Sequence, residues 1–195
     1  VKSLDGRVSE ALARNFLRQI VTGLAFMHGK GVVHRDLKCD NVLVDSASGD
    51  LKIADFGSAK NISNTTITAR GAQTIVGTPL YMAPEVVAPL TVEEDEDNYG
   101  DINGYGKKAD VWSLGILACE LADHGNLPWP KFSGPGHAFM HIGSAEGLPI
   151  IPANLSAELV DFVEQCCQRD PDKRPTTAEL SGHALFASET EELDT

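Results

Sequence analysis

The chain has 195 residues and a formal net charge of −12, with 42% hydrophobic and 23% charged residues. This balance is typical of a globular domain, and the acidic charge argues against a nucleic-acid partner, whose phosphates require basic surfaces. No apolar run reaches the length of a membrane span, so no membrane partner is expected.

The first predicted element is a helix over residues 8–28, where apolar side chains recur at helical spacing. The recurring positions are Leu17, Ile20, Val21, Leu24 and Met27. Residues 41–44 and 51–54 are predicted to form two short strands joined by a polar turn. This hairpin should bring the sequences before and after it close together in space.

The second half of the chain is predicted to be mostly helical. Residues 58–79 form a long polar segment, of a kind that is usually functional inside a compact domain, and 91–106 form an acidic loop. The helix that follows is apolar around its circumference and should be the buried centre of the fold. Its apolar positions are Val111, Trp112, Leu114, Gly115, Leu117, Ala118 and Leu121. Further helices are predicted over 137–143, 156–167 (capped by Asn154 or Ser156) and 176–185.

Two tracts hold the residue types that phosphoryl transfer requires, His-Arg-Asp-Leu-Lys-Cys-Asp-Asn at 34–41 and Asp-Phe-Gly beginning at Asp55. Asp36 would accept the proton of an attacking hydroxyl, and Lys38 would stabilise charge on the γ-phosphate. Asn41 and Asp55 would bind Mg²⁺ through a neutral and an anionic oxygen. Either tract alone could be a chance turn, so their order and the motifs that follow decide the interpretation.

Three more motifs follow in order: Gly-Thr-Pro-Leu-Tyr-Met-Ala-Pro-Glu at 77–85, Asp-Val-Trp-Ser-Leu-Gly at 110–115, and Asp-Pro-Asp-Lys-Arg-Pro at 170–175. With them, residues 1–186 resemble the carboxy-terminal lobe of a eukaryotic protein kinase. The resemblance implies a mainly α fold, a helical bundle with a short β-ribbon. In it, 34–41 would be the catalytic loop and 55–85 the activation segment, followed by an acidic tail over 187–195.

The lysine at position 38 and the Gly-Thr-Pro before Tyr81 look like serine/threonine kinases, and the tracts around them are most similar to MAP-kinase-kinase-kinase-like enzymes. The resemblance implies ATP and Mg²⁺ as cofactors. It also implies a protein substrate bearing Ser or Thr, such as a downstream kinase in a MAP-kinase-type signalling cascade.

The resemblance also implies individual roles. Thr78 would hydrogen-bond Asp36 and Lys38. The residues in contact with ATP would be Lys38, Asp55 and Leu43, of which Leu43 would lie beneath the adenine. The implied structural residues are Glu85 and Arg174 as a buried ion pair, Asp110 holding the backbone of the catalytic loop, and His34 stacked on Phe56.

A phosphorylation switch is also expected, because the Arg35 guanidinium beside the catalytic loop needs a counter-charge and a phosphate supplies about −1.5 to −2. Thr74 matches the usual phospho-acceptor position of the family, and Lys60 could help to bind the phosphate. Thr65, Thr66 and Thr68 are rival acceptors, and an unmodified polar loop is a further alternative.

Neither a G-x-G-x-x-G loop nor the strand lysine and helix glutamate that grip ATP precede residue 34. We therefore expect the amino-terminal β-lobe to be absent, and the isolated chain to bind ATP poorly and not to turn over. The first residue is Val1 rather than Met, which indicates part of a longer protein. The alternative is a non-catalytic interaction module, but the intact set Asp36, Lys38, Asn41 and Asp55 favours the enzyme.

Cysteines occur at positions 39, 119, 166 and 167, and none forms a C-x-x-C pair. This pattern favours reduced thiols over a disulfide or zinc framework. No signal-peptide pattern opens the chain. The expected location is therefore cytoplasmic.

Overall fold

A computed structural model of the chain describes residues 8–55, 60–61, 79–87, 102–144 and 146–187. The helices are α1 (Glu10–Gly29), α2 (Pro84–Val87), α3 (Ile102–Ala122), α4 (Pro135–Gly143), α5 (Ala157–Cys166) and α6 (Thr177–Leu180). The strands are β1 (Val32–Val33), β2 (Val42–Val44), β3 (Leu51–Ile53) and β4 (Lys60–Asn61). Within the described residues the strands form two antiparallel ribbons, β1–β4 and β2–β3. The expected class, a mainly α bundle with a short β-ribbon, is confirmed.

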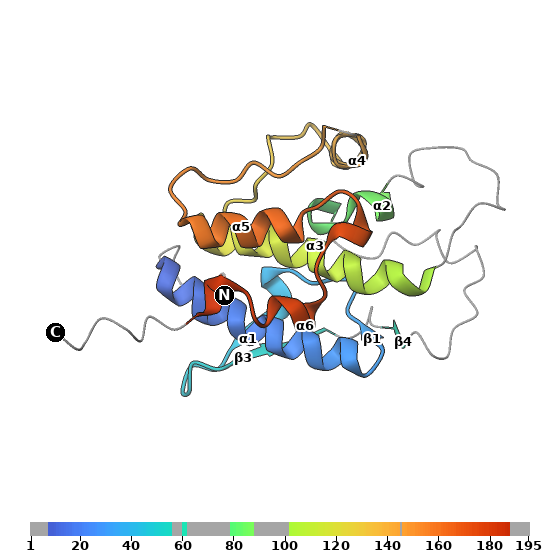
Figure 1. Cartoon of the computed structure of the whole chain (residues 1–195). Helices are drawn as coiled ribbons and strands as arrows, with labels where there is room; N and C mark the ends of the chain where they lie inside the picture. Colours follow the sequence, from blue (N-terminus) through green and yellow to red (C-terminus); the bar gives the residue numbers. More distant parts are fainter. Residues whose placement is uncertain (1–7, 56–59, 62–78, 88–101, 145, 188–195) are drawn as a thin grey trace.

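Helix α1 forms because its sequence supplies both a cap and a continuous apolar face. The Ser9 hydroxyl oxygen accepts a hydrogen bond from the Leu12 amide, and the Glu10 carboxylate in the first turn complements the helix dipole. All five apolar positions of the predicted helix are buried. Figure 1 shows α1 on the opposite side of α3 from α4, with β3 below α1 and with β1 and β4 at one end of it.

Helix α3 is the centre of the core, as its all-round apolar sequence predicts. Every residue from 111 to 121 is buried. At Gly115, a β-carbon would come within 2.5 Å of the Cys167 sulfur, so the absence of a side chain lets α5 approach α3 closely. Figure 1 shows the two helices side by side. The helix begins at Ile102, so the prediction of a loop as far as residue 106 is wrong by about one turn.

The β2–β3 hairpin lies between the two predicted motif tracts and matches its prediction closely. Val42 pairs with Ile53, Leu43 with Lys52 and Val44 with Leu51. In the turn, the Asp45 carboxylate accepts hydrogen bonds from the amides of Ala47 and Ser48, and these bonds lower the Asp45 pKa. The hairpin is attached to α1 through the Leu51 amide, which donates to the Gln19 side chain at 2.8 Å.

The carboxy-terminal helices differ more from their predictions. Helices α4 and α5 lie where expected, and Ser156, not Asn154, caps α5 by accepting from the Leu159 amide. The helix predicted over 176–185 is wrong in length, because α6 ends at Leu180. Its single turn is held by a capping box between Thr176 and Glu179, and a separate 3₁₀ helix follows over Ala184–Phe186.

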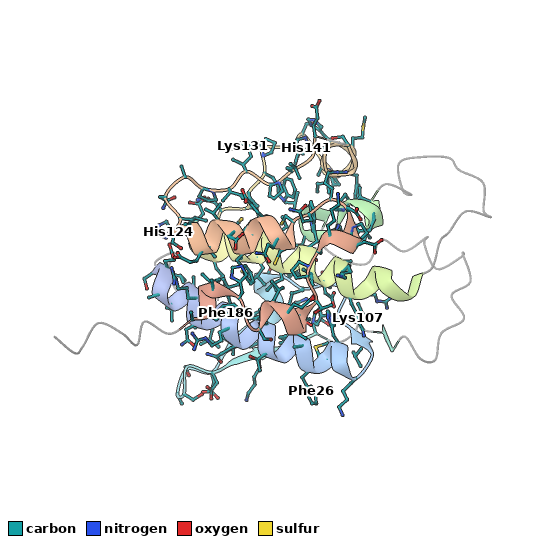
Figure 2. All side chains as sticks on the ribbon, viewed as in Figure 1. Phe26, Lys107, His124, Lys131, His141 and Phe186 are labelled. Atoms are coloured by element: carbon teal, nitrogen blue, oxygen red, sulfur yellow. The ribbon has the colours of Figure 1, made fainter. Side chains whose placement is uncertain are left out.

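The described surface carries a few large exposed apolar side chains. Figure 2 shows Phe26 projecting from α1 on the side away from α3; it is 69% exposed, with the Lys30 ammonium 5.8 Å from the centre of its ring. Among the helices described, none has the length and apolar character needed to cross a lipid bilayer.

Candidate active site

The backbone at the start of the 34–41 loop is anchored by one carboxylate on α3. Asp110, 1% exposed, accepts hydrogen bonds from the amides of His34 and Arg35, both at 2.8 Å. Arg35 has φ = 67°, a left-handed conformation that a residue with a β-carbon seldom adopts. The paired acceptor on Asp110 stabilises this turn, so a core helix determines the path of the loop.

Three of the predicted site residues form one polar cluster in this loop. The Lys38 ammonium lies 2.7 Å from the Asp36 carboxylate. The Asn41 amide nitrogen donates to the Asp36 carbonyl oxygen at 2.7 Å and to its carboxylate at 3.0 Å. The side chains of Asp36 and Lys38 are 11% and 17% exposed, so the pair is partly shielded from water but open on one side. Asp36 is thereby held in a single orientation by a cation and an amide.

The fourth residue, Asp55, is brought to this cluster by the hairpin. The Ala54 amide donates to the Asn41 carbonyl oxygen at 2.8 Å, which continues the β2–β3 pairing to the residue beside Asp55. The His34 ring makes a second link, because its Nε2 lies 3.0 Å from the Ala54 carbonyl oxygen and its Nδ1 accepts from the Asp36 amide at 3.3 Å. Asp55 is exposed and has φ = 62°, again a left-handed conformation.

These donors and acceptors fit a divalent cation. Both contacts of the Asn41 amide nitrogen are with acceptor oxygens, so they also fix which side of the amide carries the oxygen. Within the described residues that oxygen accepts no hydrogen bond, and the exposed Asp55 carboxylate lies one residue beyond the backbone partner of Asn41. One carboxylate and one amide oxygen suit Mg²⁺, which keeps other oxygen ligands from water or phosphate.

Glu85 and Arg174 form a bidentate ion pair, with both nitrogen–oxygen distances 2.6 Å. The Arg174 side chain is completely buried and also donates to the carbonyl oxygens of Lys108, Gln168 and Arg169. Its guanidinium carbon lies 5.1 Å from the centre of the Trp112 ring. The pair therefore ties the segment that ends at α2 to α3 and to the chain after α5.

A second set of contacts attaches the segment 79–81 to α3, and sequence reasoning did not find it. The Tyr81 hydroxyl donates to the buried Glu120 carboxylate, and Ser113 donates to the Tyr81 carbonyl oxygen at 2.8 Å. Burial raises the Tyr81 pKa, and the neighbouring Glu120 raises it further. The available signal was Glu120 itself, a charged residue within the otherwise apolar run from 114 to 121.

Several predicted site residues cannot be placed by side chain. Phe56, Thr74 and Thr78 lie outside the described residues, so the stacking of His34 on Phe56 and the contacts of Thr78 stay predictions. Lys60 is described only as part of β4, where it pairs with Val33. Leu43 lies on β2 and is 55% exposed, so it offers an apolar surface next to the cluster.

The sequence of residues 2–186 matches the family model of the protein kinase domain. The chain therefore belongs to the protein kinase family, whose members transfer phosphoryl groups.

Within that family it is similar to MAP kinase kinase kinases. It is 41% identical over 180 residues to the kinase YODA of Arabidopsis thaliana, a match that covers 92% of this chain and 18% of that protein. It is 37% identical to mitogen-activated protein kinase kinase kinase 3 of the same plant, over 95% of this chain and 27% of the relative. It is 34% identical to mitogen-activated protein kinase kinase kinase A of Dictyostelium discoideum, over 93% of this chain and 17% of the relative. The chain thus spans roughly a fifth to a quarter of these relatives.

Proposed function

We propose that this chain is the catalytic-loop half of a serine/threonine protein kinase that phosphorylates proteins in a MAP-kinase-type cascade. The observation that carries the proposal is the cluster in which Lys38 and Asn41 both contact the Asp36 carboxylate. A purely structural loop gains nothing from holding a carboxylate, an ammonium and an amide together on a partly open surface. In this proposal, residues 1–186 form part of a kinase domain and 187–195 an acidic tail.

In this mechanism Asp36 aligns the hydroxyl of the substrate and takes its proton as the bond to phosphorus forms. Lys38 already contacts Asp36, so it lies where it can also stabilise the oxygens of the transferred group. Thr78 would complete the contacts of these two side chains. The transition state of phosphoryl transfer is loose, so orientation and charge contribute more than full deprotonation of the hydroxyl.

Asn41 and Asp55 would hold Mg²⁺, and Leu43 would lie beneath the adenine of ATP. Bound Mg²⁺ neutralises charge on the phosphates during transfer. The relatives are named as kinases that act on kinases, which supports a downstream kinase as the substrate here. A cytoplasmic location is part of the same proposal.

The test is phosphorylation by two forms of the protein. Residues 1–195 alone should show no saturable ATP binding below about 1 mM by calorimetry, and no transfer, because the sequence contains neither a glycine-rich loop nor a lysine clamp before residue 34. The same residues joined to the ATP-binding lobe of a related MAP kinase kinase kinase should phosphorylate Ser and Thr peptides but not Tyr peptides. Tyrosine phosphorylation, or strong autophosphorylation by the chain alone, would contradict the proposal.

Thr74 is proposed as the regulatory phospho-acceptor, with Arg35 and Lys60 binding its phosphate. A phosphate there would supply the charge that the exposed Arg35 can pair with beside Asp36. Thr74→Ala should lower the activity of the joined protein, while Thr66→Ala should leave it unchanged. Mass spectrometry of the active form should find phosphate at Thr74; an unmodified Thr74 with undiminished activity of the alanine variant would reject the assignment.

A further inference from the structure

A buried chain of hydrogen bonds extends from Asp110 away from the proposed reaction centre. The His28 Nε2, at the end of α1, lies 2.9 Å from the Asp110 carboxylate, and the His28 Nδ1 lies 3.2 Å from the Thr177 hydroxyl on α6. Thr177, His28 and Asp110 are only 3%, 6% and 1% exposed. Three helices that are distant in sequence thus meet through polar groups in the core.

The chemistry of these groups fixes the direction of each hydrogen bond. The Asp110 carboxylate is an acceptor for the His34 and Arg35 amides, so the His28 Nε2 must carry the proton that it shares with Asp110. In the neutral ring the Nδ1 then has only a lone pair, which the Thr177 hydroxyl satisfies as donor. Within the described residues that hydroxyl has no other partner.

We propose that Thr177 is a positioning residue for the 34–41 loop. Its hydroxyl holds one nitrogen of the His28 ring while Asp110 holds the other, so the ring is fixed in plane and in tautomer. A ring fixed at both nitrogens keeps its Nε2–H directed at Asp110 and keeps that carboxylate oriented toward the His34 and Arg35 amides. The loop that bears Asp36 is thereby coupled to α6, although Thr177 touches no reacting group.

The position of Thr177 favours this role over simple packing. Helix α6 is a single turn whose start is locked by the capping box of Thr176 and Glu179, so the next residue, Thr177, has little freedom. A buried hydroxyl is also unfavourable unless it is hydrogen-bonded, and an apolar side chain of the same shape would fill this space equally well. The hydroxyl therefore has a use only if its bond to His28 matters.

The test measures amide hydrogen exchange of the ¹⁵N-labelled chain by NMR, without nucleotide. Thr177→Val keeps the shape and removes the hydroxyl; it should speed exchange at the His34 and Arg35 amides about five- to tenfold relative to the α3 amides from 114 to 118. Thr177→Ser should restore the slow exchange. Thr22→Val is the matched control, since it removes an exposed hydroxyl whose one partner among the described residues is the Arg18 carbonyl oxygen. It should change exchange neither in the loop nor in α3.

His28→Phe keeps a planar ring but removes both ring nitrogens, and with them the acceptor for the Thr177 hydroxyl. The double variant with Thr177→Val should therefore exchange no faster at the loop amides than His28→Phe alone. Equal acceleration of the loop and α3 amides by Thr177→Val would mean a general loss of stability and would overturn the inference. Unchanged loop exchange in Thr177→Val would also overturn it, and so would strictly additive effects of the Thr177 and His28 substitutions. The consequence for catalysis rests on the proposed function. The exchange measurement does not, so the two can fail separately.

Discussion

Replacing Asp36 by Asn should lower kcat for peptide phosphorylation about 10²- to 10⁴-fold in the form joined to an ATP-binding lobe. The amide has nearly the shape of the carboxylate and can still accept from Lys38 and Asn41, so the loop should keep its conformation. What it loses is the ability to take the proton of the attacking hydroxyl. The loss should therefore appear in kcat, with KM for ATP little changed.

The matched control is Asp50→Asn, which neutralises an exposed aspartate in the hairpin turn far from the cluster. It changes the net charge by the same amount, so it separates the role of Asp36 from a general effect of charge. Its kcat should stay within about twofold of the unmodified protein. An Asp36→Asn variant that retains more than a tenth of the activity would exclude Asp36 as the base.

The second large effect is expected on stability. Arg174→Ala should lower the free energy of unfolding of the chain by about 3–5 kcal/mol, measured by urea denaturation. The substitution leaves the Glu85 carboxylate without its partner and three carbonyl oxygens without a donor, in a position where the arginine side chain is completely buried. The stacking of the guanidinium over Trp112 is lost as well.

Two variants separate these contributions. Lys173→Ala removes the neighbouring cation, which is 70% exposed and 3.8 Å from Asp170, and should change stability by less than about 0.5 kcal/mol. Arg174→Lys keeps the charge but loses the planar fork, so it should lie between the alanine variant and the unmodified chain. If Arg174→Lys unfolds with the same free energy as the unmodified chain, the charge alone matters. If Arg174→Ala does so, the structural role of Arg174 is refuted.

The parts of the fold with strong periodicity were predictable from sequence. The five apolar positions of α1 form one face, which packs against the core, and the apolar run of α3 covers its whole circumference, which requires burial on all sides. The β2–β3 hairpin was equally clear. The end of α6 was not, because its apolar residues continue at helical spacing while the chain actually turns after Leu180 and resumes as a 3₁₀ helix.

The local part of the candidate site was also predictable, since Asp36, Lys38 and Asn41 lie within six residues of one another. The supporting contacts were not. Asp110 was found only through the family resemblance, and His28 and Thr177 carry no local sign that they meet across 149 positions of sequence. Long-range polar pairs of this kind depend on how the helices pack, which periodicity does not specify.

Asp110 has one more consequence for the molecule. The carboxylate that secures the His34 and Arg35 amides belongs to the most deeply buried helix, so the loop cannot open by the fraying that usually releases surface loops. Its opening requires either the breaking of two charge-assisted bonds or the melting of the core itself. Local opening of the proposed catalytic loop should therefore be rarer than that of an ordinary surface loop, and it should cost less only when the contacts around Asp110 are weakened.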